Sequence, residues 1–194
     1  MLTNLPNLLT LSRIAAIPII SALLFWSGGR DAALVSWTAC ALFTLAALTD
    51  MLDGYLARTR RETSRFGQFL DPVADKLLVA AVLLLLVGID RIIGVHLVPA
   101  LVILCREILV SGLREFLAGT RVSMPVTQLA KWKTTIQMVA LGFLIVGDTG
   151  PHWLPVSGIG LAGLWIAALL TLITGYDYFM RGMRHIVSDQ RAGE

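Results

Sequence analysis

The chain of 194 residues is 56% hydrophobic and only 15% charged, with a formal net charge of +3. Soluble domains usually contain about a quarter charged residues, so this composition excludes an ordinary soluble protein and predicts an integral membrane protein. The length suits one domain, and we expect residues 1–194 to form it. The modest net charge gives no reason to expect a nucleic-acid partner.

Six segments are long and apolar enough to be membrane-spanning helices, which need about 20 mostly apolar residues. In chain order they are 8–27, 33–56, 72–90, 93–117, 127–147 and 156–179. The connections between them are short and contain turn residues such as glycine, aspartate and proline. The sequence therefore predicts an all-α membrane protein with six transmembrane helices.

The placement of basic residues predicts how the chain is oriented. Six spans put both termini on one side of the membrane, and most of the 16 Lys and Arg residues fall on that side. Only Arg30 and Arg91 fall on the opposite side, and Arg106 lies within a span. Since loops rich in Lys and Arg stay cytoplasmic, we expect both termini in the cytoplasm.

Three charge-free stretches are too short to cross the hydrocarbon by themselves. They span residues 77–89, 92–105 and 134–147, which is 13, 14 and 14 residues. At the cytoplasmic end of each stretch the helix continues with ionisable residues, namely Asp71, Asp75 and Lys76, or Arg106 and Glu107, or Lys131 and Lys133. Charges at such depth usually line a water-filled cavity. We therefore expect a polar cavity that faces the cytoplasm.

Four aspartates near the cytoplasmic side form two pairs, Asp50 with Asp53 and Asp71 with Asp75. Spacings of three and four residues put each pair on one helical face, and the short connection lets the pairs face each other. Four unpartnered carboxylates would cost on the order of 10 kcal/mol in a membrane. Divalent cations remove this cost, and oxygen ligands favour Mg²⁺ or Mn²⁺. Two such ions suit a displacement at phosphorus.

Small residues follow the first aspartate pair. Gly54 lies in a helix, where Gly is about 1 kcal/mol less favourable than Ala. Either close helix packing or a ligand against the backbone would explain it, and the neighbouring aspartates favour the ligand. Ala57 could be small for the same reason, and Arg58 could bind a phosphate with two hydrogen bonds. Gly67 and Pro72 predict a turn and the start of the third span.

The order Asp50-x-x-Asp53-Gly54-x-x-Ala57-Arg58, followed by Gly67, Asp71 and Asp75, resembles the signature of the CDP-alcohol phosphotransferase family. This resemblance implies a six-helix membrane enzyme, usually a homodimer, that contains two divalent cations. It also implies transfer of a phosphatidyl group from CDP-diacylglycerol, a membrane lipid, to a small alcohol.

The resemblance further implies a role for each residue of the site. All four aspartates would bind metal, and Asp75 would also be the catalytic base toward the incoming hydroxyl. The residues implied in CDP-diacylglycerol binding are Asn7, Thr10, Gly54, Ala57, Arg58 and Ser64. Asn7 and Thr10 share a helical face with Arg13, so a polar helix start at the membrane interface is the alternative explanation for them.

Basic residues outside this signature indicate an anionic acceptor. Arg106 lies well within a predicted span and needs an anion, for which Glu107 is one candidate. Lys131 and Lys133 open the fifth span, where a lysine pair by itself would be a topology signal. Together these cations exceed what one diphosphate requires.

Three segments, NLPNLLT, REILVSGLR and KWKTTIQMVA, resemble bacterial members of the same family that use glycerol 3-phosphate. This resemblance implies phosphatidylglycerophosphate and CMP as products, and the bacterial cytoplasmic (inner) membrane as the location. The residues implied in binding the acceptor phosphate are Arg106, Arg114, Lys131 and Lys133.

Two alternatives are open at this point. The same chemistry could use another alcohol such as inositol phosphate or serine, and charge alone does not exclude inositol phosphate. A divalent-cation transporter is disfavoured, because a path for Mg²⁺ should not be lined by Arg and Lys, and the outer half of the spans has no charges.

Overall fold

The computed structural model describes residues 5–27, 32–60, 65–119 and 128–192. Within them the chain forms six long α-helices and two short 3-10 helices, with no strand. In order these are α1 (Leu5–Trp26), α2 (Ala32–Arg60), α3 (Arg65–Gly88), η1 (Gly94–His96), α4 (Leu97–Gly119), α5 (Gln128–Val146), η2 (Gly147–Thr149) and α6 (Val156–Ala192). The predicted all-α fold is confirmed.

Five helices are long and apolar enough to cross a membrane: α1, α2, α4, α5 and α6. α3 differs because Asp71, Asp75 and Lys76 lie in its first half, whereas its second half is apolar. Charged residues are the costliest ones to place in hydrocarbon. The helix that is least suited to lipid is therefore the one that contains the second aspartate pair.

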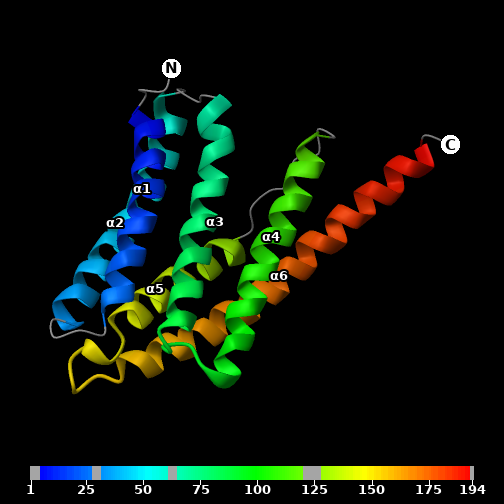
Figure 1. Ribbon diagram of the computed structural model, residues 1–194. Coiled ribbons are helices and arrows are strands. Elements are labelled where there is room, and N and C mark those ends of the chain that lie inside the picture. Colours follow the sequence, from blue (N-terminus) through cyan, green and yellow to red (C-terminus); the bar gives the residue numbers. More distant parts are fainter. Residues whose placement is uncertain (1–4, 28–31, 61–64, 120–127, 193–194) are drawn as a thin grey trace.

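The helices form two groups that meet along the bundle. α1 packs against α2 and α3, and α6 packs against α4 and α5 (Figure 1). Contacts of α2 with α5 and of α3 with α4 join the groups. The first residue of α1 and the last residue of α6 lie toward the same end of the bundle (Figure 1).

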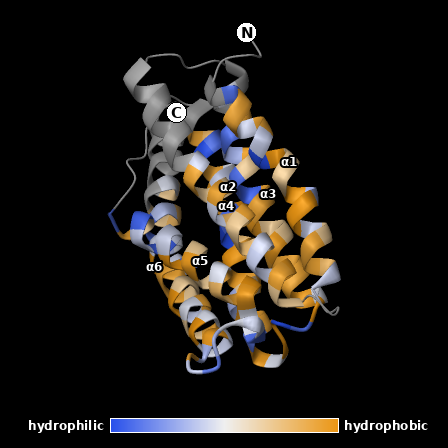
Figure 2. Ribbon diagram, turned by 90° about the vertical axis from the view of Figure 1, so that its left-hand side faces the viewer, coloured by the Kyte–Doolittle hydropathy of each residue, from blue (hydrophilic) through white to orange (hydrophobic). Residues whose placement is uncertain are grey.

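Hydrophobic side chains cover the outside of the bundle as well as its interior. Phe25 is 74% exposed, Leu84 73% and Leu101 61%, and such residues cover the flanks of the helices (Figure 2). A soluble monomer rarely exposes so continuous an apolar surface. Together with the five apolar helices, this surface identifies a multi-pass membrane protein.

Close packing of α5 on α6 depends on two glycines of α6. A Cβ added at Gly160 would lie 2.8 Å from Leu144 Cγ, and one at Gly163 would lie 2.9 Å from Ala140 Cβ. Small residues let helices approach closely in membranes, where the hydrophobic effect between helices is weak. These glycines therefore fix the position of α5, which contributes one wall of the site below.

The predicted start of the third span is wrong. α3 begins at Arg65, so Pro72 lies inside the helix and Gly67 is a buried helical residue rather than part of a turn. Proline in a helix interior leaves the carbonyl of residue 68 without its usual N–H partner. Membrane helices tolerate this because neighbouring groups satisfy the freed carbonyl. The helix consequently includes Asp71, just before the proline.

Arg91, in the turn that follows α3, binds groups of α2 and α5 and the residue that follows α1. Its guanidinium donates to the carbonyls of Leu144 (3.0 Å) and Ile145, which end α5, and to the hydroxyls of Ser36 (2.9 Å) and Ser27 (3.4 Å). Burial lowers the pKa of Arg91, and the nearby carboxylate of Asp148 partly offsets this. The guanidinium thus satisfies carbonyls that a helix C-terminus leaves without donors.

We expect Arg91→Met to reduce the free energy of unfolding by about 2 kcal/mol, because the carbonyls of α5 lose a charged donor. Thermal unfolding in detergent measures this change. Arg91→Lys keeps the charge but not the planar donor group, so its free energy of unfolding should lie between those of the wild type and Arg91→Met. An unchanged unfolding temperature for Arg91→Met would contradict this role. His152→Ala, an exposed position in the same region, serves as the control.

Candidate active site

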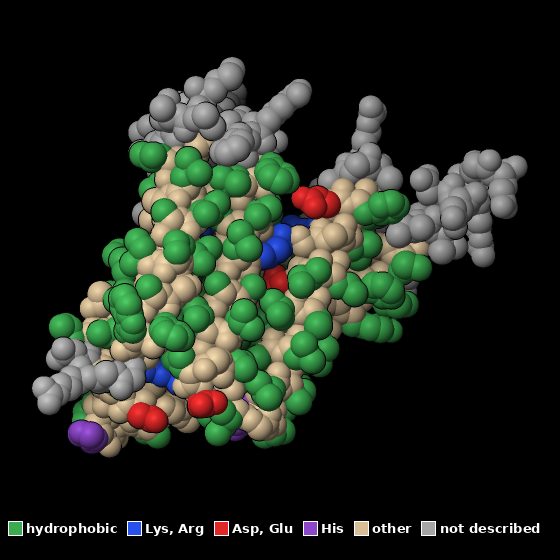
Figure 3. Space-filling view, in the orientation of Figure 1, with side chains coloured by type: hydrophobic (Ala, Val, Ile, Leu, Met, Phe, Trp, Pro, Cys, Tyr) green, Lys and Arg blue, Asp and Glu red, His purple; other side chains and the backbone are tan. Residues whose placement is uncertain are grey.

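A polar cavity of about 370 Å³ lies between α3, α4, α5 and α6. Charged side chains gather where the bundle opens between α3 and α4, and hydrophobic side chains surround them (Figure 3). The polar residues that line the cavity are Asp71, Asp75, Lys76, Arg106, Glu107, Arg114, Lys133, Thr134, Gln137 and Tyr178. The cavity therefore combines a pair of carboxylates with several cations.

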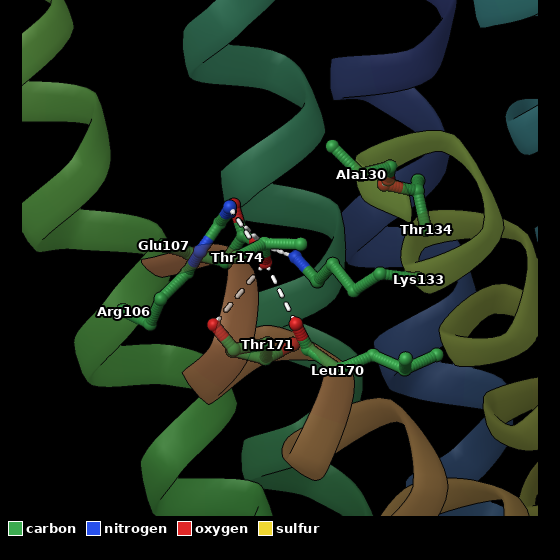
Figure 4. Close-up of polar contacts among 8 residues, drawn as sticks. All are labelled: Arg106, Glu107, Ala130, Lys133, Thr134, Leu170, Thr171 and Thr174. Carbon is green, nitrogen blue, oxygen red and sulfur yellow. Dashed lines mark hydrogen bonds and ion pairs between the residues drawn. The ribbon is translucent and has the colours of Figure 1, made fainter. Parts of the chain in front are cut away.

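Glu107 holds two cations on one side of the cavity. Lys133 Nζ donates to Glu107 Oε1, and Arg106 Nη1 lies 3.5 Å from the same oxygen. Only 2% of the Lys133 side chain is exposed, so its charge depends on this partner. Figure 4 shows the three side chains, from α4 and α5, pointing toward one another. One carboxylate cannot neutralise both cations, so the cluster keeps a net positive charge.

α6 completes this basic wall. Arg106 Nη2 donates to Thr174 Oγ1 at 3.4 Å, and Thr174 in turn donates to the carbonyl of Leu170 at 2.8 Å (Figure 4). The guanidinium carbons of Arg106 and Arg114 each lie 6.0 Å from the centre of the buried Tyr178 ring. An aromatic ring attracts cations at this distance, so Tyr178 holds both arginines beside the cavity.

α1 holds the aspartates on the other side. Thr10 Oγ1 donates to Asp71 Oδ1 at 2.5 Å, and Arg13 Nη1 donates to Asp75 Oδ1. The Arg13 side chain is fully buried, whereas 46% of the Asp75 side chain is exposed. Asn7, Thr10 and Arg13 are all buried, as a shared helical face requires. Arg13 thus fixes the carboxylate of Asp75 while leaving part of it open to the cavity.

Two predicted acceptor-binding lysines are separated by the structure. Lys133 is buried in the cavity wall, whereas Lys131 is exposed and lines a different, apolar groove between α2 and α5. Residues two positions apart in a helix point in different directions. Arg106, Arg114 and Lys133 therefore lie around one cavity, and Lys131 does not line it.

The first aspartate pair belongs to the end of α2. The predicted residues there are Asp50, Asp53, Gly54, Ala57 and Arg58, whose side chains lie outside the described part of the structure, as does Ser64 altogether. Among the described residues no group of three or more His, Cys, Asp or Glu is placed to hold a metal. Of the four predicted metal ligands, the structure describes the side chains of Asp71 and Asp75. Their carboxylate oxygens fit Mg²⁺ or Mn²⁺.

Some residues of this site were given no binding role from the sequence. Tyr178, Thr174 and Gln137 line the cavity or contact its cations, but an isolated polar residue in an apolar helix does not reveal which neighbour it meets. Gln137 carries the clearest signal, since it lies four residues after Lys133 and therefore on the same helical face. Gly175 of α6 also had no predicted role. A Cβ there would lie 3.1 Å from Arg106 Cγ, so the glycine leaves room for the Arg106 side chain.

Comparison with known proteins identifies the class of enzyme. The family model of the CDP-alcohol phosphatidyltransferases matches residues 3–173, and the chain belongs to this family. Similar proteins include one from Rickettsia bellii, 49% identical over 91% of this chain and 93% of its own length, and one from Bacillus subtilis, 38% identical over 92% and 94%. Another, from Cereibacter sphaeroides, is 38% identical over 96% and 99%. All three are named CDP-diacylglycerol–glycerol-3-phosphate 3-phosphatidyltransferase.

We expect Glu107→Gln to lower the free energy of unfolding by roughly 3 kcal/mol, because it leaves the buried ammonium of Lys133 without an anion. Added inorganic phosphate should restore more stability to this variant than to the wild type, since the phosphate can replace the lost carboxylate. Thermal unfolding in detergent, with and without phosphate, measures both effects. Glu115→Gln, an exposed change on the same helix, should show neither. Equal stability of Glu107→Gln and wild type would contradict the shared ion pair.

Proposed function

We propose that this membrane enzyme transfers the phosphatidyl group of CDP-diacylglycerol to glycerol 3-phosphate, which gives phosphatidylglycerophosphate and CMP. The observation that carries the proposal is one cavity with the carboxylates of Asp71 and Asp75 on one side and Arg106, Arg114 and Lys133 on the other. The relatives named for this reaction match the chain along most of its length, which supports the same acceptor.

The reaction is a displacement at phosphorus. The acceptor hydroxyl oxygen bonds to the phosphorus that bears diacylglycerol, and the bond from that phosphorus to the oxygen of CMP breaks, with its electrons leaving on CMP. Asp75 takes the hydroxyl proton, a role that requires it to lie within hydrogen-bond reach of the acceptor. Arg13 holds this carboxylate in place, and positioning of the acceptor hydroxyl beside it supplies part of the activation.

The basic wall binds the phosphate of the acceptor. Phosphate is a dianion near neutral pH, and the cluster of Arg106, Lys133 and Glu107 has a positive charge left over. Arg114, held beside Tyr178, adds another. Charge-assisted hydrogen bonds from Arg are well suited to phosphate oxygens. An acceptor bound in this way has its reacting hydroxyl pointing toward α3, where Asp75 lies.

The enzyme uses two divalent cations, Mg²⁺ or Mn²⁺, held by Asp50, Asp53, Asp71 and Asp75. When bound, such ions neutralise the diphosphate and stabilise CMP as the leaving group. Asn7, Thr10, Gly54, Ala57, Arg58 and Ser64 contact the CDP-diacylglycerol headgroup. The hydrogen bond from Thr10 to Asp71 supports this part of the proposal, because it brings the start of α1 next to the proposed metal ligands.

In this proposal the whole chain forms one domain in the bacterial inner membrane. Its six spans are the five apolar helices and α3. The cavity and both termini face the cytoplasm, and two copies form a homodimer. The charged half of α3 lies near the end of the bundle that also holds the first residue of α1 and the last residue of α6, which supports this orientation (Figure 1). Water-soluble glycerol 3-phosphate then reaches the cavity from the cytoplasm.

Purified enzyme with Mg²⁺ and CDP-diacylglycerol should release CMP with glycerol 3-phosphate and not with serine or inositol phosphate. Asp75→Asn should reduce this rate on the order of 10²–10⁴-fold, because general base catalysis contributes about that much. Asp90→Asn, an exposed turn residue with φ of 59°, should keep the wild-type rate, since Asn tolerates this backbone conformation. CMP release with serine or inositol phosphate, but not with glycerol 3-phosphate, would reject the proposed acceptor.

Removal of divalent ions with EDTA should abolish CMP release, and Mn²⁺ or Mg²⁺ should restore it. Electron paramagnetic resonance of bound Mn²⁺ measures the ions directly. We expect about two ions per chain, as for other paired-metal sites that act on phosphates, and fewer in Asp71→Asn. Full activity in EDTA, or equal Mn²⁺ binding in wild type and Asp71→Asn, would argue against these ligands.

A further inference from the structure

Gln137 is a buried side chain of the cavity wall whose oxygen has no partner. The residue is 2% exposed and lines the cavity, and its Oε1 accepts no hydrogen bond. Among the described residues that line the cavity, only Gln137 has a buried side-chain oxygen without a hydrogen-bond partner. Because buried polar atoms are nearly always hydrogen-bonded, this oxygen indicates a donor that is absent from the free protein.

The position of Gln137 narrows what that donor can be. It follows Lys133 by one helical turn on α5, about 6 Å farther along the helix axis at 1.5 Å per residue. Apolar Val79 and Met138 also line the cavity. Gln137 lines the cavity, but its oxygen has almost no accessible surface in the free protein. A small molecule that enters the cavity therefore supplies the donor once the amide turns toward it.

The charges in the cavity determine which group of the ligand meets this oxygen. An amide oxygen carries partial negative charge, so it repels a phosphate oxygen and attracts a hydroxyl hydrogen. Arg106, Arg114 and Lys133 offer only donors and suit the phosphate. Glu107 Oε1 already interacts with Lys133 and Arg106. In the proposed reaction Asp75 receives the proton of the reacting hydroxyl, so a second hydroxyl needs a different acceptor.

We propose that Gln137 is a specificity-determining residue: its Oε1 accepts a hydrogen bond from the hydroxyl of the acceptor that does not react. This inference rests on the proposed function. The site then selects a phosphorylated polyol rather than any phosphorylated alcohol, because an acceptor without the second hydroxyl leaves a buried oxygen unpaired. Sites built to bond a hydroxyl discriminate strongly against analogues that lack it.

The test compares two acceptors with two forms of the enzyme. Glycerol 3-phosphate and 3-hydroxypropyl phosphate share a phosphate and a primary hydroxyl, but only the first has a hydroxyl on the middle carbon. CMP release gives kcat/KM for each acceptor with wild type and with Gln137→Met, which has a similar length and no amide. Gln128→Met, a change at the exposed first residue of α5, is the matched control.

We expect the wild type and Gln128→Met to prefer glycerol 3-phosphate by about tenfold or more. In Gln137→Met, kcat/KM for glycerol 3-phosphate should fall about tenfold, and the two acceptors should become nearly equal. An equal fall for both acceptors would overturn the proposal, since it would mean that the amide serves the phosphate or the fold. Wild type that discriminates between the acceptors no better than Gln137→Met would also overturn it.

Thermal unfolding without acceptor separates recognition from a structural role. Gln137→Met should unfold at the wild-type temperature or above, because it removes an unpaired buried oxygen, whereas a lower temperature would overturn the proposal. Gln137→Leu gives a second test, with the same loss of discrimination expected. If wild type releases no CMP with either acceptor, the proposed function itself fails. If it turns over glycerol 3-phosphate but Gln137→Met still discriminates, only the role of Gln137 fails.

Discussion

The interaction on which the site depends is the sharing of Glu107 by Lys133 and Arg106. Both cations lie among apolar helices, where a lone charge is costly, and Lys133 is almost fully buried. One carboxylate is enough to keep the two charges in place but not enough to neutralise them. The site thus remains attractive to an anion without being unstable in its absence. Arg114, held by the ring of Tyr178, adds to this attraction at low structural cost.

On the opposite side of the cavity the two carboxylates carry negative charge, and they too are held by partners of a neighbouring helix. Carboxylates of α3 meet donors from α1, where Arg13 binds Asp75 and Thr10 binds Asp71. Because the aspartates lie on α3 whereas Arg106, Arg114 and Lys133 lie on α4 and α5, a substrate that carries a phosphate and a hydroxyl has one favoured direction in the cavity. Fixed groups of this kind stabilise a reacting geometry without reorganising at the moment of reaction. The poor suitability of α3 as a membrane span is the cost of this arrangement.

How much the sequence could predict depends on how local each feature is. The helices follow from composition, and the charges that weaken α3 were visible in its short charge-free stretch. Lys131 and Lys133 were predicted as equals, because their environments differ only once α5 is packed by Gly160 and Gly163 of α6. Pro72 was assigned to a helix start, since local preference does not show how neighbouring helices support a proline. The roles of Asp50 and Asp53 remain predictions.

Affinity and selectivity have different physical origins in this cavity. Cations attract any phosphate, so the basic wall alone would accept glycerol 3-phosphate and 3-hydroxypropyl phosphate alike. A neutral amide such as that of Gln137 contributes little to attraction, but a buried oxygen without a partner penalises every acceptor that cannot supply a donor there. The low polarity of the surrounding bundle increases this penalty. A site in a membrane can therefore derive selectivity from one uncharged side chain, provided that charged neighbours have already fixed the position of the phosphate.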